Sequence, residues 1–238
     1  MTTPKGGAWS STRASGDEAR GGKRALAACT AWGGRLHALL ADGSLLRLES
    51  GAWLPVSGAD EAFTADASPL LAFDEARGLL VCWGPQKKSG GRKDETLIHD
   101  GKAWQKVKKG KAKVAEAERF DLVYDASRGG VVRLGDVELA VFDGKSWTPQ
   151  ALAGSGIAGY HRCVGVAQGA LFVLNPTKGI LLRVDGEQIV EVGTFDKPMP
   201  REPHDNMPFD TPWFDPTGRR FVVHLNEDDR VNFALKLD

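Results

Sequence analysis

Cysteine is scarce in this sequence, which has three among 238 residues, and no two of them form a Cys-x-x-Cys pair. Cys29, Cys82 and Cys163 are far apart, so their spacing predicts neither a disulfide framework nor a zinc site. We expect buried free thiols instead, which are typical of a reducing compartment such as the cytoplasm.

Long hydrophobic runs and an excess of one charge are also missing. No apolar stretch approaches the roughly 18 residues of a membrane span, and residues 1–24 lack the apolar centre of a secretory signal. Lys plus Arg and Asp plus Glu both number 31, so the formal net charge is zero. These features predict a cytoplasmic protein with no membrane partner, and they argue against a general nucleic-acid partner.

Catalytic and cofactor motifs are absent as well. There is no Gly-x-Ser-x-Gly elbow for a serine nucleophile, and the Gly-Gly pairs lack the strand–loop–helix context of a phosphate-binding loop. The five histidines are scattered, and no pair has the spacing of metal ligands on a helix. The sequence therefore assigns no catalytic residue, no cofactor and no metal site, and it does not favour an enzyme.

The main feature that the sequence does have is a repeat. A glycine followed shortly by tryptophan recurs at Gly51–Trp53, Gly101–Trp104 and Gly144–Trp147, with a period of roughly 40 to 50 residues. Residues 71–78 (LAFDEARG) and 122–129 (LVYDASRG) are near copies of each other, and an apolar segment follows each of them. Periods of this length are typical of the blades of a β-propeller.

Each unit has the pattern of four short antiparallel strands. In the second unit, apolar and β-branched segments at 69–73, 79–83, 95–99 and 103–107 are bounded by Gly and Asp turns. Asp-Gly pairs such as Asp143-Gly144 tolerate the positive φ that tight hairpin turns require. Weaker copies extend the series in both directions, so five units are predicted.

The last unit lacks its Gly-x-Trp strand, and Gly6–Thr12 carries that signature with no strands before it. The economical interpretation is a ring in which residues 6–12 complete the last blade, because closure removes open strand edges. The alternative is a coincidental Trp9 in a terminal tail. The expected fold is a single all-β domain, a five-bladed β-propeller closed by its N-terminal strand. Its expected blades span residues 25–56, 69–107, 119–150, 160–192 and 211–238 plus 6–12.

Two parts of the sequence resemble known propeller repeats. Leu71–Trp83 with Asp100–Trp104, and Leu122–Leu134 with Asp143–Trp147, resemble bacterial kelch-type repeats. Trp213–Val223 resembles the Asp-Pro-x-Gly-Arg-Arg turn of TolB-like propeller repeats. The resemblance implies four-stranded, kelch-like blades. Kelch-like and TolB-like propellers mostly bind proteins, with occasional enzymes, so the resemblance also implies binding rather than catalysis.

The long segments between blades, and the long loop within the second blade, are expected on one face of the ring, where function usually resides. Residues 84–113 there carry ten basic and three acidic side chains. One interpretation is a patch for an acidic partner or a phosphate backbone; the other is a solvated pair of loops. The candidate partner-binding residues from this segment are Lys87, Lys88, Arg92, Lys93, Lys108 and Lys109.

A second candidate segment is the proline-rich stretch 195–215, which has four prolines before Asp210. His204 and Asp205 lie beside each other there and offer metal ligands or an acid–base pair, whereas a Pro-rich crossover with surface charges explains the segment equally well. His161 begins an inner strand at the expected mouth of the central channel. The candidates from these two places are His161, Arg201, His204, Asp205 and Asp210.

These observations favour a monomeric, non-enzymatic scaffold for protein–protein interaction, which binds a partner through the face that carries the long loops. The alternative is a glycan-binding or glycoside-processing propeller with two carboxylates near the central channel. Its candidate acids are Asp66, Asp121, Asp205 and Asp210. A lectin with one site per blade is less favoured, because the long loops share no sequence.

Overall fold

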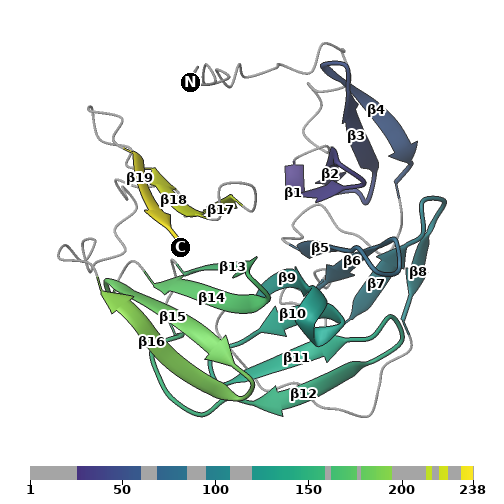
Figure 1. Ribbon diagram of the computed structural model, residues 1–238. Helices are drawn as coiled ribbons and strands as arrows, with labels where there is room; N and C mark the ends of the chain where they lie inside the picture. Colours follow the sequence, from purple (N-terminus) through teal and green to yellow (C-terminus); the bar gives the residue numbers. More distant parts are fainter. Residues whose placement is uncertain are drawn as a thin grey trace.

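The computed structural model describes residues 26–59, 69–84, 95–107, 120–158, 162–175, 178–194, 213–215, 220–224 and 232–237. Within these ranges the chain is β-structure with one short 3-10 turn, η2 (Ala126–Arg128). The strands form four four-stranded antiparallel sheets and one three-stranded sheet, each built from consecutive strands (Figure 1). The first two sheets contain β1 (Leu26–Trp32), β2 (Arg35–Leu40), β3 (Leu45–Glu49), β4 (Ala52–Ser57), β5 (Leu70–Asp74), β6 (Leu79–Trp83), β7 (Thr96–His99) and β8 (Trp104–Lys106). The others contain β9 (Asp121–Asp125), β10 (Gly130–Leu134), β11 (Glu138–Phe142), β12 (Trp147–Ala151), β13 (Cys163–Ala167), β14 (Ala170–Asn175), β15 (Ile180–Asp185), β16 (Gln188–Thr194), β17 (Trp213–Asp215), β18 (Arg220–His224) and β19 (Asn232–Lys236).

The sheets follow one another in chain order around a shared centre, with their first strands innermost. β1 contacts β5, β5 contacts β9, β9 contacts β13, and β13 contacts β17. The second strands, such as β6 and β10, are nearly all apolar because sheets cover both of their faces. The outermost strands, such as β12, are half-exposed. This arrangement is that of propeller blades.

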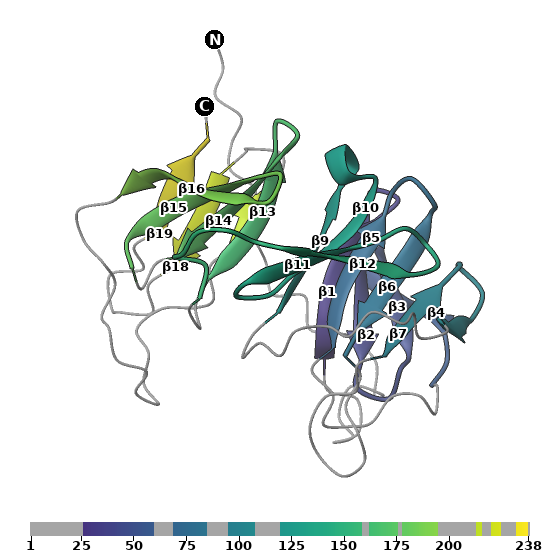
Figure 2. The ribbon, with the colours of Figure 1, turned by 90° about the horizontal axis from the view of Figure 1, so that it is seen from below.

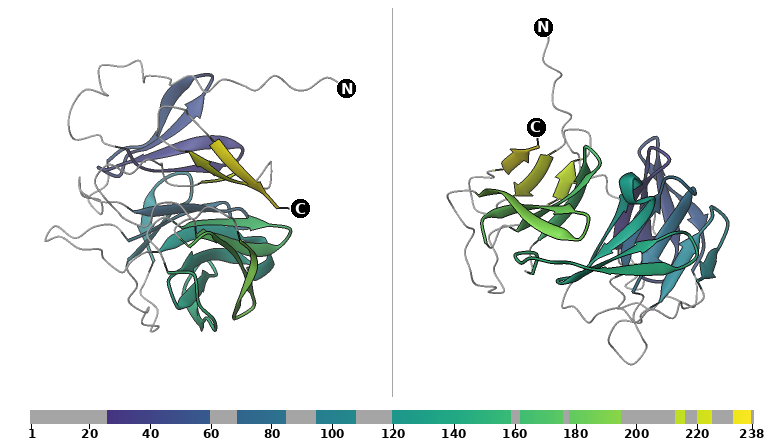
Figure 3. Two further views of the ribbon diagram at one scale, coloured as in Figure 1. Left: turned by 90° about the vertical axis from the view of Figure 1, so that its left-hand side faces the viewer. Right: turned by 60° about the horizontal axis from the view of Figure 1, so that its bottom comes forward.

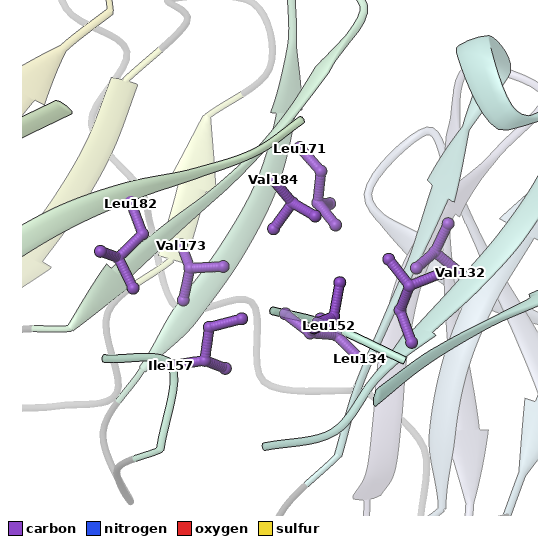
Figure 4. Close-up of a cluster of buried hydrophobic side chains, with 9 residues drawn as sticks. Val132, Leu134, Leu152, Ile157, Leu171, Val173, Leu182 and Val184 are labelled. Carbon is purple, nitrogen blue, oxygen red and sulfur yellow. The ribbon is translucent and has the colours of Figure 1, made fainter. Parts of the chain in front are cut away.

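Apolar cores lie between successive sheets rather than within one central layer. The largest joins the third and fourth sheets through residues such as Val132, Leu134, Leu171 and Val173 (Figure 4). On β10, Val132 and Leu134 belong to this core, whereas Val131 belongs to the core shared with the second sheet. Successive side chains of a strand therefore pack against the sheets on opposite sides of it, as the two-residue period of a strand requires.

Two further cores complete the series. Leu39, Leu45, Leu80, Cys82 and Leu97 join the first sheet to the second. Cys163, Ala167, Leu174, Leu181, Phe221 and Leu237 join the fourth sheet to the three-stranded one. In the part of the chain that the structure describes, no such core joins the three-stranded sheet to the first sheet.

These findings confirm repeated four-stranded antiparallel sheets, whereas the five complete blades and the closure of the ring stay predictions. The described residues form four four-stranded sheets and not five complete blades, and they do not form a closed ring. The C-terminal unit has three strands. The predicted closing strand, residues 6–12, lies outside the described residues.

The Asp-x-x-Arg repeat joins the second sheet to the third and the third sheet to the fourth. Asp74 is fully buried and accepts from the Arg77 guanidinium at 2.8 Å, and Arg77 also donates to the Gly129 carbonyl of the third sheet at 3.0 Å. Asp125 and Arg128 form the same pair, and Arg128 donates to the Val184 carbonyl of the fourth sheet at 3.1 Å. Each buried carboxylate thus orients an arginine so that its guanidinium donates to the backbone of the following sheet.

The glycine of the Asp143-Gly144 turn is part of the same joint. Gly144 has φ +93°, and a Cβ there would lie 2.6 Å from Cδ of Arg77. A side chain at this position would therefore be strained and would also displace Arg77. The turn glycine both permits the turn and leaves room for the neighbouring sheet's arginine.

The repeated tryptophans make contacts in the opposite direction along the chain. The Trp104 indole N–H donates to the Gly43 carbonyl of the first sheet at 3.1 Å. The Trp147 indole N–H donates to Thr96 Oγ1 of the second sheet at 2.7 Å. Both markers of the sequence repeat are therefore contacts between sheets, which explains why they recur.

The cysteines form no disulfide. Cys82 and Cys163 are buried, as expected, but Cys29 on β1 is exposed, which corrects the prediction of three buried thiols. Burial raises the pKa of the Cys82 thiol far above its usual range. Cys82 is therefore a packing residue rather than a nucleophile.

Candidate functional site

The antiparallel order places alternate connections at opposite ends of every sheet. The connections between first and second strands, such as η2 and the β13–β14 turn, lie at one end, which we call the short-turn face (Figures 2 and 3). Two kinds of connection lie at the opposite end, which we call the long-loop face. They are the connections between second and third strands, and the connections from one sheet to the next. The short-turn face is formed by tight turns such as 126–129 and 143–146.

Every partner-binding residue predicted from the sequence lies outside the residues that the structure describes, so those assignments stay predictions. They are Lys87, Lys88, Arg92, Lys93, Lys108, Lys109, His161, Arg201, His204, Asp205 and Asp210. The structure does describe the strand ends from which their segments start. These strand ends lie on the long-loop face.

Two of these segments, 85–94 and 108–119, have adjoining ends on the second sheet. The Gly84 N–H donates to the Glu95 carbonyl at 3.0 Å, which joins the two ends of the first segment. The Val107 N–H donates to the Thr96 carbonyl at 2.9 Å, which brings the start of the second segment beside the end of the first. Lys106 Nζ adds an ion pair to Glu95 at 2.6 Å.

The remaining end, at Phe120, is held to the same place by aromatic packing. The rings of Trp83 and Phe120 are 4.7 Å apart, centroid to centroid, in an edge-on arrangement. The buried Arg133 guanidinium lies between them and Trp147, 4.7 to 5.2 Å from the three ring centroids. Stacking of a cation on several rings in a dry site contributes more than it does at the surface. The residues at the four ends of the two basic segments, Gly84, Glu95, Val107 and Phe120, thus lie together. We call this place the base of the candidate site.

An ion-pair network extends this base to the fourth sheet. Arg162, fully buried, donates to Asp121 at 2.5 Å and to Asp136 at 2.6 Å, and also to the Leu134 carbonyl at 3.0 Å. Asp121 directly follows Phe120, and Arg162 directly follows the predicted candidate His161. The network therefore fixes the end of the 159–161 segment beside the end of the 108–119 segment.

Phe120, Arg133 and Arg162 are the residues of this base whose role the sequence analysis missed. Arg162 directly follows His161, which was expected at the mouth of the central channel, and the structure buries the Arg162 side chain completely. Arg133 stands inside an apolar strand segment, GVVRL, with no charged neighbour on that strand. An arginine within a buried strand was the available signal, because such a charge requires partners from other elements.

The carboxylates of the glycosidase alternative receive little support. Asp66, Asp205 and Asp210 lie outside the described residues, and Asp121 is engaged by Arg162. Among the residues that the structure describes, no group of three His, Cys, Asp or Glu is placed to hold a metal ion. No helix in the same ranges has the length and apolar character needed to cross a membrane.

A groove of about 330 Å³ lies on the short-turn side, between the third and fourth sheets. Its lining includes Ser127, Arg128, Gln150, Ala170 and Asp185. The guanidinium of Arg128 is already bound by Asp125 and by the Val184 carbonyl, and Asp185 pairs with Arg183 at 2.6 Å. The charges of the groove are thus paired within the protein.

The comparisons with known proteins extend to the fold alone. No protein-family model matches the chain, and no curated protein matches it. Among solved structures, a catalytically inactive virginiamycin B lyase from Staphylococcus aureus, with quinupristin, has a TM-score of 0.51 at 9% identity, covering 92% of this chain and 72% of that one.

Two further solved structures align with lower scores. A streptogramin B lyase has a TM-score of 0.49 at 11% identity, covering 88% of this chain and 68% of that one. YCF48 from Cyanidioschyzon merolae has a TM-score of 0.49 at 10% identity, covering 85% of this chain and 64% of that one. These neighbours are β-propeller-type proteins. The four-stranded antiparallel sheets, together with the likeness to the virginiamycin B lyase structure, show an all-β fold of the β-propeller type.

Proposed function

We propose that this chain is a non-enzymatic interaction scaffold, cytoplasmic and monomeric, which binds a protein partner with an acidic surface through its long-loop face. The proposal rests on the common base of the two basic segments, where Gly84, Glu95, Val107 and Phe120 are held together. Segments that leave one rigid base present their charges to the same partner surface. The kelch-like resemblance of the second and third units supports binding as well.

The first partner-binding residues that we propose are basic. Lys87, Lys88, Arg92 and Lys93 belong to the first segment, and Lys108 and Lys109 to the second. His161 adjoins the Arg162 network and is proposed as a further contact. Arg201, His204, Asp205 and Asp210 follow the end of β16, at the long-loop end of the fourth sheet, and are proposed to border the same surface.

Reversal of charge on the first segment is expected to abolish partner binding. In affinity capture from the native host's lysate, Lys87→Glu/Lys88→Glu should lower recovery of the partner at least tenfold, because like charges then face the acidic surface. The control is Lys102→Glu/Lys145→Glu, which makes the same change of charge at exposed positions on the short-turn face. The control should retain the partner. The measurement is quantitative mass spectrometry of the captured proteins.

Two results would contradict the proposal. One is recovery of the same proteins by the parent and by both variants. The other is loss of all captured material after nuclease treatment of the lysate, which would assign the basic segments to a phosphate backbone.

We also propose the complete five-bladed ring, in which residues 6–12 pair with β19 and close the last kelch-like blade. Deletion of residues 1–12 should lower the free energy of unfolding by roughly 2 kcal/mol or more, because each ladder hydrogen bond contributes about 1 kcal/mol net. Deletion of residues 1–4 is the control and should have no effect. Urea unfolding followed by circular dichroism measures both. Equal stability of the two deletions would argue for a terminal tail without a pairing partner.

A further inference from the structure

Two histidines lie at the contact between the first and second sheets. His99 on β7 is fully buried and His37 on β2 is 4% exposed. Both rings lie against Trp32, with centroid distances of 4.8 Å to His37 and 6.1 Å to His99, and His99 lies 5.0 Å from Trp104. None of the functions considered above uses this cluster.

The hydrogen bonds of His99 determine its protonation state. The Gly101 N–H donates to Nδ1 of His99 at 3.0 Å, so Nδ1 carries no proton and the ring is neutral. Nε2 of His99 is buried and has no hydrogen-bond partner among the described residues. A second proton on this ring would therefore remove one hydrogen bond and place a charge in an apolar, aromatic site.

His37 has the opposite arrangement. Its Nδ1 lies 3.1 Å from the Arg35 carbonyl, so this nitrogen carries the proton and donates it. The charged groups around the cluster are Asp100 beside His99, and Arg35 and Arg47 beside His37. Both arginines pair with Glu49, at 3.3 and 2.6 Å.

We propose that His99, together with His37, makes the contact between the sheets β1–β4 and β5–β8 sensitive to pH. A proton taken from solvent at Nδ1 of His99 displaces the hydrogen bond from Gly101. The Asp100–Gly101 turn, against which the Trp32 ring lies, then loses its hydrogen bond to the His99 ring and keeps those that the Asp100 carboxylate accepts from the Lys102 and Ala103 N–H groups. The device is a joint between sheets, independent of the partner surface on the long-loop face.

The direction of the effect follows from the pKa values. Burial lowers the pKa of His99 below the ordinary value, and its neighbour His37 lowers it further, although Asp100 acts in the opposite direction. Burial also lowers the pKa of His37, as do the charges of Arg47 and Arg35, although the hydrogen bond to the Arg35 carbonyl acts in the opposite direction. An opened joint thus binds more protons than the closed one as pH falls below about 6.5, and the closed joint loses stability there. As pH rises above about 6.5, protonation of the two histidines no longer lowers the stability of the closed joint.

Hydrogen exchange of the Gly101 amide tests this proposal, because that amide is the donor to His99. In the parent, its protection factor, corrected for the intrinsic rate, should fall by up to roughly tenfold per histidine between pH 7.5 and 5.5. His99→Asn keeps an acceptor near the Nδ1 position but does not titrate, so its protection should fall by no more than the roughly tenfold that His37 alone contributes. His224→Asn, on the C-terminal sheet, is the control and should retain the parent's pH dependence.

The proposal is overturned if the parent's protection is equal at both pH values, or if His99→Asn shows the same fall as the parent. Should His99→Asn fail to fold, NMR titration of the parent decides the question. The expected result is a His99 pKa below 6.5, with the Gly101 amide shift changing at the same midpoint. A His99 ring that titrates at or above that value, with the Gly101 shift unchanged, would refute the proposal.

Discussion

Arg162→Met is expected to lower the free energy of unfolding by about 3 to 5 kcal/mol. The Arg162 side chain is completely buried, and its guanidinium neutralises two carboxylates whose side chains are only 15% and 21% exposed. Removal of the cation takes away the positive charge that neutralises the carboxylates of Asp121 and Asp136, which is the costly way to break a buried ion pair. Urea unfolding, followed by circular dichroism, measures the change.

Two variants separate this cause from simple loss of packing. Arg183→Met removes an ion pair between side chains that are both about two-fifths exposed, 41% and 43%, and should cost less than about 1 kcal/mol. The triple variant Arg162→Met/Asp121→Asn/Asp136→Asn also removes the two carboxylate charges and should recover more than half of the loss. A cost for Arg162→Met as small as that for Arg183→Met would show that the network contributes little.

Gly130→Ala is expected to destabilise the third sheet by about 3 kcal/mol, near the upper end of the usual cost of overpacking. A Cβ at Gly130 would lie 2.1 Å from the Phe142 carbonyl oxygen, which belongs to the paired backbone of β11. This atom is not the end of a flexible side chain, so β10 and β11 would have to separate. The second unit has Leu79 at the corresponding position, so the requirement is specific to the third sheet.

The adjacent glycine provides a matched control. Gly129 has φ +71°, and a Cβ added to it would meet no atom within 4 Å, so Gly129→Ala should cost only the conformational penalty, about 1 to 2 kcal/mol. Both variants are compared by their urea midpoints. A smaller loss for Gly130→Ala than for Gly129→Ala would mean that the two strands accommodate the extra methyl group.

The strands of the repeat were predictable because they depend on local pattern. The segment 79–83 was expected as a strand and is one, Leu79–Trp83, and the segment 69–73 is shifted by a single residue, to Leu70–Asp74. Alternation, apolar runs and Asp-Gly turns are all short-range signals. Closure of the ring stays a prediction, since the Gly-x-Trp signature of residues 6–12 indicates a strand but not the sheet with which that strand pairs.

The base of the candidate site was not predictable, because its contacts join residues that are far apart in the sequence. Arg162 meets Asp121 and Asp136, which lie 41 and 26 residues earlier in the chain. Arg133 stands out as a charge in an apolar strand, but the rings that it meets come from three separate strand ends, which its own strand does not indicate. The long loops have neither a hydrophobic period nor a turn motif, so sequence reasoning identifies their charge but not their shape.

The contacts between sheets have a consequence for how such a chain is assembled from units. The second and third units each carry an arginine that reaches the backbone of the unit after it and a tryptophan that reaches the unit before it. A unit of this kind carries the side chains for its contacts with both neighbouring units. A duplicated copy would therefore fit between its neighbours without new contacts having to arise. Growth of the array by duplication is therefore straightforward, and the joints at its two ends are the ones that require a different solution.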